Sequence, residues 1–138
     1  EGQAAIEWEQ AADTTETFAF PCSVTEQDGF IVIDGVELVY WSTEELRRGS
    51  PLSRVAAGFH NGLAGALVHA CLLVRDRWGL NEVALSGGTF QNLLLSERVT
   101  AGLEAAGFAV HLHSRVPAND GGISLGQAAA AAARMRAG

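Results

Sequence analysis

The chain has 138 residues, of which 48% are hydrophobic and 18% charged, with 16 acidic against 9 basic residues. This length and composition indicate one globular domain and argue against disorder. A net charge of −7 without a basic stripe argues against nucleic-acid binding, and the absence of lysine excludes P-loop and Schiff-base lysine chemistry.

The N-terminal part predicts a helix followed by antiparallel strands. Residues 3–12 place apolar side chains among good helix formers, which is typical of a short helix. Apolar residues alternate with small or polar ones over 18–22, and the apolar runs 30–33 and 36–41 flank an Asp-Gly dipeptide at 34–35. Because Asp-Gly suits a two-residue hairpin turn, we expect two or three strands here.

Two helices are expected next. Ser42 and Glu45 match a capping box, which predicts a short helix that ends near 49–51. From 52 to 78 apolar residues recur every three or four positions, which predicts the longest helix, with Gly79 as its C-cap.

The C-terminal part alternates strands with helices, as is typical of an α/β fold. We expect a strand at 82–86, a helix at 90–106 closed by Gly107, a strand at 108–113 and a last helix at 122–136.

The segment LSGGTFQN at 85–92 is the first candidate site, because two glycines join a strand to a helix. Such a turn exposes backbone N–H groups to a ligand, and the amide of Asn92 would face the same opening. The structural alternative is a tight turn with Asn92 on the surface. Ser86 is a weak candidate nucleophile, since it lacks a GxSxG elbow and a placed base.

The segment Asn-Asp-Gly-Gly at 119–122 is the second candidate, again between a strand and a helix. Asp120 suits a helix cap better than a lone cation ligand. Both glycine turns follow neighbouring strands, however, and open α/β sheets bind ligands at that edge. We therefore expect a ligand site there.

Other residues give weaker signals. Cys22 and Cys71 stand outside any CxxC motif and predict two buried thiols rather than a zinc site or disulfide. His60 and His69 fall on opposite helix faces, so they cannot share a metal, although 59–61 could line a pocket. No apolar run is expected to span a membrane, and the chain shows no signal peptide at its start.

Five segments together resemble one enzyme family. They are EGQAA at 1–5, FHN at 59–61, LSGGTFQN at 85–92, AAGF at 105–108 and PANDGGISLGQA at 117–128. In this order they are similar to the C-terminal end of the HypF carbamoyltransferases of nickel-iron hydrogenase maturation. The resemblance covers nearly the whole chain and is strongest after residue 52.

This resemblance implies an α/β fold, the C-terminal half of an actin-like ATPase (ASKHA) domain with a β-hairpin region near the N-terminus. The whole chain, 1–138, would be its C-terminal lobe, with a hairpin and short-helix region at 13–50 and an α/β core at 52–138. It would be a fragment of a larger, multidomain, cytoplasmic protein. That protein would make carbamoyl adenylate from carbamoyl phosphate and ATP and transfer the carbamoyl group to the C-terminal cysteine of a HypE partner.

The resemblance also assigns residues. Gly87 and Gly88 would line the nucleotide of carbamoyl adenylate, Asn92 would hydrogen-bond it, and Glu1 would lie near the ribose. Asp120 would be one ligand of a single divalent metal ion of the iron or magnesium class. Two histidines outside this chain would complete the metal site, so the chain alone is expected to be inactive.

Three alternatives stay open. The first is an O-carbamoyltransferase of natural-product biosynthesis, which has the same fold. The second is a non-catalytic nucleotide-binding or interaction remnant. The third, half of a sugar kinase, is disfavoured by the pattern at 119–127.

Overall fold

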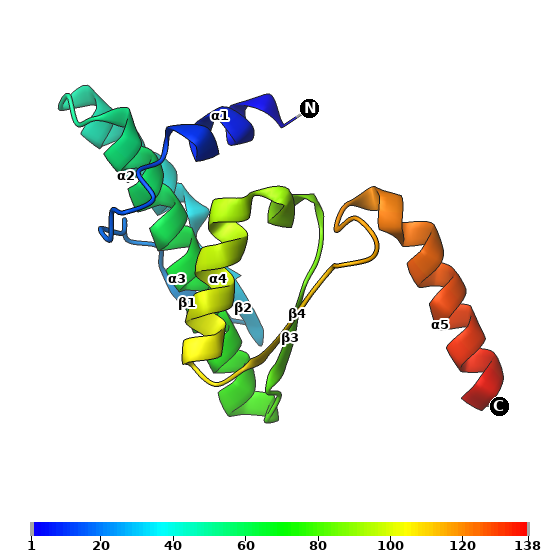
Figure 1. Ribbon diagram of the computed structural model, residues 1–138. Coiled ribbons are helices and arrows are strands. Elements are labelled where there is room, and N and C mark those ends of the chain that lie inside the picture. The colour runs from blue at the N-terminus through cyan, green and yellow to red at the C-terminus, as the bar shows by residue number, and fades with distance from the viewer. Residues whose placement is uncertain (1, 138) are drawn as a thin grey trace.

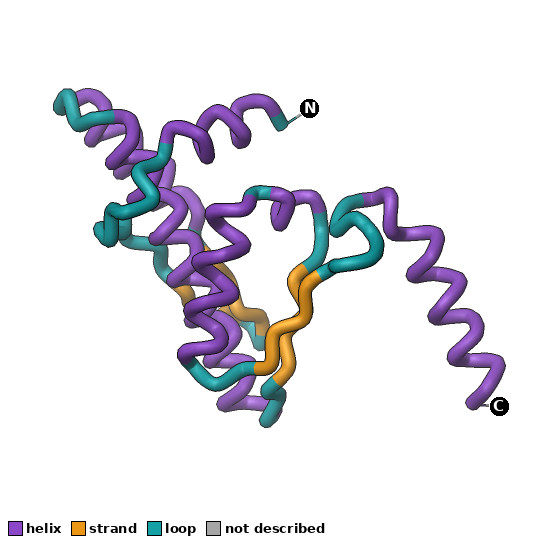
Figure 2. Tube along the Cα trace, viewed as in Figure 1, coloured by secondary structure: helices purple, strands orange, loops and turns teal. Residues whose placement is uncertain are grey.

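The computed structural model describes residues 2–137, and in this range two small, separate sheets lie beside a group of packed helices (Figures 1 and 2). In chain order the elements are α1 (Gln3–Ala11), β1 (Val24–Gln27), β2 (Phe30–Ile33), α2 (Gly35–Arg47), α3 (Leu52–Trp78), β3 (Glu82–Leu85), the 3₁₀ turn η1 (Gly88–Gln91), α4 (Leu93–Ala105), β4 (Ala109–Leu112), the 3₁₀ turn η2 (Asp120–Gly122) and α5 (Ile123–Ala137).

Helix α3 is the spine of the fold, because α1, α2 and α4 all pack against it. Its expected C-cap is confirmed: Gly79 has a φ of 69° and its N–H bonds to the carbonyl of Arg75 at 2.7 Å. Small side chains let the neighbouring elements approach α3 closely. The buried residues of α3 are Val55, Ala56, Ala57, Gly58, His60, Gly62, Ala64 and Ala66.

Two apolar clusters lie along α3, and the half-buried Leu63 contacts both. The larger cluster joins α3 to α4 and to the strands β3 and β4; its buried members are Ala64, Leu85, Leu95, Val99, Leu103 and Phe108. The smaller one joins α3 to α2 and the preceding loop; its buried members are Phe20, Leu38 and Val55. The core therefore follows one helix rather than filling the space between two layers.

Strands β3 and β4 pair in parallel, with Val83 opposite Val110 and Leu85 opposite Leu112. Val83, Leu85 and Val110 pack toward α3 and α4, whereas the alternate residues of both strands are exposed. Helix α5 extends away from the strands, and its side chains through Arg136 are exposed (Figure 1). One face of this strand pair is therefore uncovered, whereas parallel sheets are normally covered on both faces.

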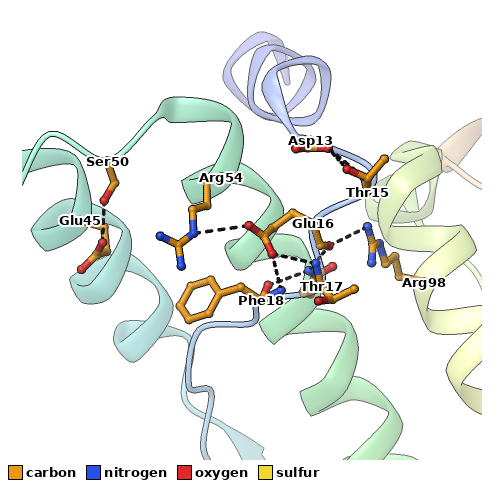
Figure 3. A network of polar contacts seen from close by, with 10 residues as sticks. Asp13, Thr15, Glu16, Thr17, Phe18, Glu45, Ser50, Arg54 and Arg98 are labelled. Atoms are coloured by element: carbon orange, nitrogen blue, oxygen red, sulfur yellow. Dashed lines mark hydrogen bonds and ion pairs between the residues drawn. The ribbon is translucent and has the colours of Figure 1, made fainter.

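The segment between α1 and β1 is fastened by polar contacts (Figure 3). Glu16 accepts hydrogen bonds from the N–H groups of Thr17 and Phe18, both at 2.9 Å, and pairs with Arg54 of α3 at 3.4 Å. Arg98 of α4 donates to the carbonyl of Thr14 at 2.8 Å. Hydrogen bonds from Thr15 hold the pKa of the Asp13 carboxyl below its usual value.

The expected hairpin turn at 34–35 is wrong. The strands pair across the other Asp-Gly dipeptide, where Asp28 and Gly29 have φ of 51° and 83°. Asp34 instead caps α2, because its carboxylate accepts from the Val36 N–H at 2.9 Å. The second expected strand, 36–41, is therefore the start of a helix.

Two further expectations in this region also fail. Residues 18–22 form no strand; they run along α3, with the Phe20 N–H bonded to the Gly58 carbonyl at 3.0 Å. Ser42 is no N-cap either, because it lies inside α2, buried, and its hydroxyl has no hydrogen-bond partner among the described residues.

The remaining elements agree with expectation to within a few residues, and the cysteines are free and half-buried. Burial raises the pKa of the Cys71 thiol. The pKa of the Cys22 thiol is raised mainly by burial and, to a smaller extent, by the negative charge of Glu37.

Helix α3 is more apolar than the sequence analysis expected of any segment. By length and mean hydropathy, 1.4 over its most apolar 18-residue window, it is apolar enough to cross a membrane. Core helices meet the same criteria, and α3 packs against α1, α2 and α4 with His60 buried in its middle.

Two glycines of α3, one closely packed and one in open space, allow a test of stability. A Cβ at Gly62 would collide with the Phe20 carbonyl and lie 2.7 Å from Leu38 Cδ2, whereas a Cβ at Gly65 meets nothing within 4 Å. We expect Gly62→Ala to lower the free energy of unfolding by about 1–3 kcal/mol. Gly65→Ala should raise it by about 0.5–1 kcal/mol through helix propensity. Urea denaturation measures both, and equal effects would contradict this packing.

Candidate functional site

A pocket of about 790 Å³ lies between α1, α3 and the N-terminal end of α4. Its lining is mostly apolar, with polar groups from His60, Asn92 and the glycine turn before α4. The residues that line it are Gly2, Ala4, Ala5, Ile6, Trp8, Glu9, Phe59, His60, Leu63, Gly88, Thr89, Gln91, Asn92 and Leu95. An apolar cavity with a few convergent polar groups is the usual form of a small-molecule site.

The glycine turns come together as predicted. Strands β3 and β4 are neighbours, and the Gly87 N–H donates to the carbonyl of Ala118 at 2.8 Å, joining the turn after β3 to the loop after β4. Gly87 needs to be glycine, since its φ is 97°. Gly88 lines the pocket, and a Cβ there would meet nothing within 4 Å.

Asn92 is the N-cap of α4 rather than a residue of its first turn. Its Oδ1 accepts from the Leu95 N–H at 2.8 Å, and its Nδ2 lies 2.9 Å from Nε2 of His60. The side chain is half-buried at the pocket wall. The expectation that 59–61 could line a pocket holds for Phe59 and His60 at this pocket, whereas Asn61 lines a smaller, separate one and donates to the carbonyls of Glu16 and Phe18.

Glu9 of α1 closes the N-terminal end of α4. Its Oε1 accepts from the N–H groups of Leu93 at 2.6 Å and Leu94 at 3.2 Å. Carboxylates are favourable at this end of a helix dipole. Because Asn92 accepts from the Leu95 N–H, the first three N–H groups of α4 already have acceptors. An anionic ligand here would have to bind the N–H groups of the glycine turn instead.

Asp120 is exposed at the start of η2. The helix cap that the sequence analysis considered for Asp120 is formed by Asn119 instead. Asn119 Oδ1 accepts from the Gly121 N–H at 3.1 Å. Within residues 2–137 no group of three or more histidine, cysteine or acidic side chains is placed to hold a metal ion. Asp120 is thus one carboxylate without companions in this part of the protein. Glu1 lies outside the described residues.

Besides the contact between Asn92 and His60, two others escaped the sequence reasoning because they join distant residues. Glu9 meets α4 across 84 positions, and Ser86 Oγ lies 2.9 Å from Nε2 of His113. Ser86 therefore does have a histidine beside it, contrary to expectation. Both residues are exposed, and no third side chain within residues 2–137 hydrogen-bonds His113, so the pair lacks an orienting group. His111 contacts Glu82 instead, at 3.0 Å.

Comparison with known proteins gives the family. A family profile described as the second subdomain of the Kae1-like domain of carbamoyltransferases, HypF_C_2, matches residues 1–127. The chain belongs to this family. It is 38% identical over 137 residues to the carbamoyltransferase HypF homolog of Cupriavidus necator, covering 96% of this chain. The carbamoyltransferase HypF of Synechocystis is 33% identical over 129 residues, or 92% of this chain.

Solved structures agree. A crystal structure of full-length HypF in the phosphate- and nucleotide-bound form superposes with a TM-score of 0.87 at 38% identity, covering 92% of this chain. That of T. kodakarensis HypF gives 0.71 at 27% identity, covering 93%. The chain spans 35% of the C. necator relative, 16% of the Synechocystis one and 17% of the first crystallised chain. It therefore corresponds to one part of much longer proteins.

The Glu9 contact can be tested by substitution. We expect Glu9→Ala to lower the free energy of unfolding by about 1 kcal/mol, because two N–H groups and the dipole of α4 lose their partner. Glu9→Gln keeps an acceptor oxygen and should lose less. Glu7→Ala, which removes only an exposed contact with Gln3 on the same helix, is the matched control. Thermal and urea denaturation of the four proteins would show this order, and equal losses for Glu7 and Glu9 would argue against the contact.

Proposed function

We propose that this chain forms one wall of the site in which a carbamoyltransferase moves a carbamoyl group from carbamoyl adenylate to an acceptor protein. The adenylate would be made from carbamoyl phosphate and ATP by other parts of the full-length protein. The acceptor would be the C-terminal cysteine of a HypE-like partner in hydrogenase cyanide-ligand assembly, and the reaction would take place in the cytoplasm. Family membership and the carbamoyltransferase names of the relatives support the reaction class.

The pocket beside the glycine turn is the observation that carries the proposal. Its apolar side, which includes Ile6, Trp8 and Phe59, suits a flat aromatic base. Its polar end holds Gly88 and Asn92, where backbone and amide N–H groups suit ribose and phosphate oxygens. The proposal also includes Glu1 as a residue near the ribose.

The proposal includes a divalent metal ion, for which this chain would supply one ligand, Asp120. The Asp120 carboxylate makes no side-chain hydrogen bond within residues 2–137, which leaves both oxygens available as ligands. Iron or magnesium ions need several further ligands, and these would come from outside the chain. Such an ion would neutralise negative charge on the ligand.

The same geometry suggests that the chain alone does not catalyse transfer. One face of the β3–β4 pair and all of α5 through Arg136 are exposed, and Asp120 faces no second metal ligand among the described residues. The first lobe of the domain would cover these surfaces and complete the site. A non-catalytic remnant, the alternative reading, would keep the pocket, but metal ions would have no effect on its activity.

The glycine turn offers a test that spares the fold. Because a Cβ at Gly88 meets nothing within 4 Å, Gly88→Leu should leave the melting temperature of the full-length protein unchanged while filling the pocket. We expect adenylate formation, followed by ATP–pyrophosphate exchange, to persist. Carbamoyl transfer to the partner's cysteine, followed with labelled carbamoyl phosphate, should fall about tenfold or more, since a ligand group is displaced.

Gly35→Leu provides the control, because it adds the same side chain at an equally open position on α2. Normal transfer by the Gly88→Leu protein would exclude this turn from the site and refute the proposal.

The metal assignment is tested by Asp120→Asn in the full-length protein. Loss of one charged ligand should lower the bound metal per chain, measured by elemental analysis after dialysis, and should abolish the stimulation of transfer by added metal. Asp76→Asn, on the distant end of α3, serves as the control. An unchanged metal content in the Asp120→Asn protein would remove Asp120 from the metal site.

A further inference from the structure

His60 is buried in the middle of α3, with 3% of its surface exposed, yet it lines the pocket. Its Nδ1 lies 2.8 Å from the carbonyl oxygen of Ala56, one turn earlier on the helix. A carbonyl oxygen only accepts hydrogen bonds, so Nδ1 must carry the proton. In a neutral imidazole the other nitrogen, Nε2, is then an acceptor.

The partner of Nε2 is the amide of Asn92 at 2.9 Å, which must therefore present its Nδ2 to the histidine. The capping bond gives the same answer independently. Because the Leu95 N–H donates, the atom 2.8 Å away on Asn92 must be Oδ1. Two bonds on opposite ends of the amide thus fix the same orientation, and reversing it would break both.

An amide nitrogen carries two hydrogens, and only one of them is used by His60. Within residues 2–137, Nδ2 makes no other hydrogen bond, and Asn92 lines the pocket. The second N–H is therefore available to a ligand, and its direction is set by the two bonds that hold the amide.

We propose that His60 is a positioning residue, which fixes the Asn92 amide so that this wall of the pocket offers a donor and selects a ligand with an acceptor oxygen. The proposal rests on the function proposed above, in which the pocket holds the nucleotide part of carbamoyl adenylate. A ribose or phosphate oxygen fits this donor, whereas an N–H of a ligand at the same place would be rejected. His60 itself does not touch the ligand through Nε2, which the amide covers.

The test compares substitutions at both residues in the full-length protein, with transfer to the acceptor cysteine as the readout. His60→Leu fills the buried position with an apolar side chain but removes both bonds, and should raise the KM for transfer about three- to tenfold with little change in kcat. His60→Gln offers one amide donor for Ala56 and one acceptor for Asn92, and should restore most of the loss. His69→Leu, on the opposite, exposed face of α3, is the matched control.

Asn92→Asp separates capping from ligand binding. Aspartate caps a helix as well as asparagine does, so the bond from the Leu95 N–H is kept and only the bond to His60 is lost, as in His60→Leu. The side chain now carries only acceptors, so transfer should fall at least as far as in His60→Leu, because an acceptor oxygen of the ligand meets a carboxylate. Equal transfer by the wild type and the Asn92→Asp protein would overturn the proposal, as would equal losses in the His60→Leu and His60→Gln proteins.

The outcomes also separate this inference from the proposed function. If the pocket does not hold the adenylate, Gly88→Leu leaves transfer intact along with all substitutions at positions 60 and 92. If the pocket does hold it but His60 does not position Asn92, Gly88→Leu lowers transfer while His60→Leu changes only the melting temperature.

Discussion

The close approach of the chain to α3 at Gly58 and Gly62 is the constraint on which the rest of the structure depends. Here the Phe20 N–H bonds to the Gly58 carbonyl, and the Phe20 carbonyl lies where a Cβ of residue 62 would be. Because nothing larger than hydrogen stands at these positions, Phe20 and Leu38 reach the helix and complete the smaller cluster. That cluster fixes the path of the chain from α1 to α2, and so places α1 over the pocket.

The pocket is then a product of helix packing as much as of the glycine turn. Trp8 of α1 meets Phe59 of α3 edge to face, with ring centroids 6.2 Å apart, and Glu9 joins α1 to α4. The site thus has a hydrophobic wall from two helices and a polar wall from the start of a third. Dispersion between aromatic rings holds the hydrophobic wall, and the dipole of α4 favours the carboxylate at the polar wall. The polar groups of the cavity come from residues distant in sequence.

Local signals in the sequence predicted the parts of the fold that local chemistry decides. The 3.6-residue period and Gly79 defined α3, and Gly87 marked the turn before α4. The hairpin was misplaced because two Asp-Gly dipeptides fit the same turn rule, and only the bond from the Val36 N–H to Asp34 shows which one starts a helix. The site was predicted at Asn92, but its contact with His60 across 32 positions has no local signature.

Helix α1 has no fully buried residue, although it supplies five of the fourteen residues that line the pocket. It is attached mainly through Trp8, which packs on Phe59 and the smaller cluster, and through the Glu9 carboxylate, while α3 and α4 share a continuous apolar core. Stability in proteins is distributed unevenly, and segments with few buried contacts open at a fraction of the cost of global unfolding. The cavity is therefore bounded on one side by α3, which carries the buried core, and on the other by a helix with no fully buried residue, for which we expect a lower cost of local opening.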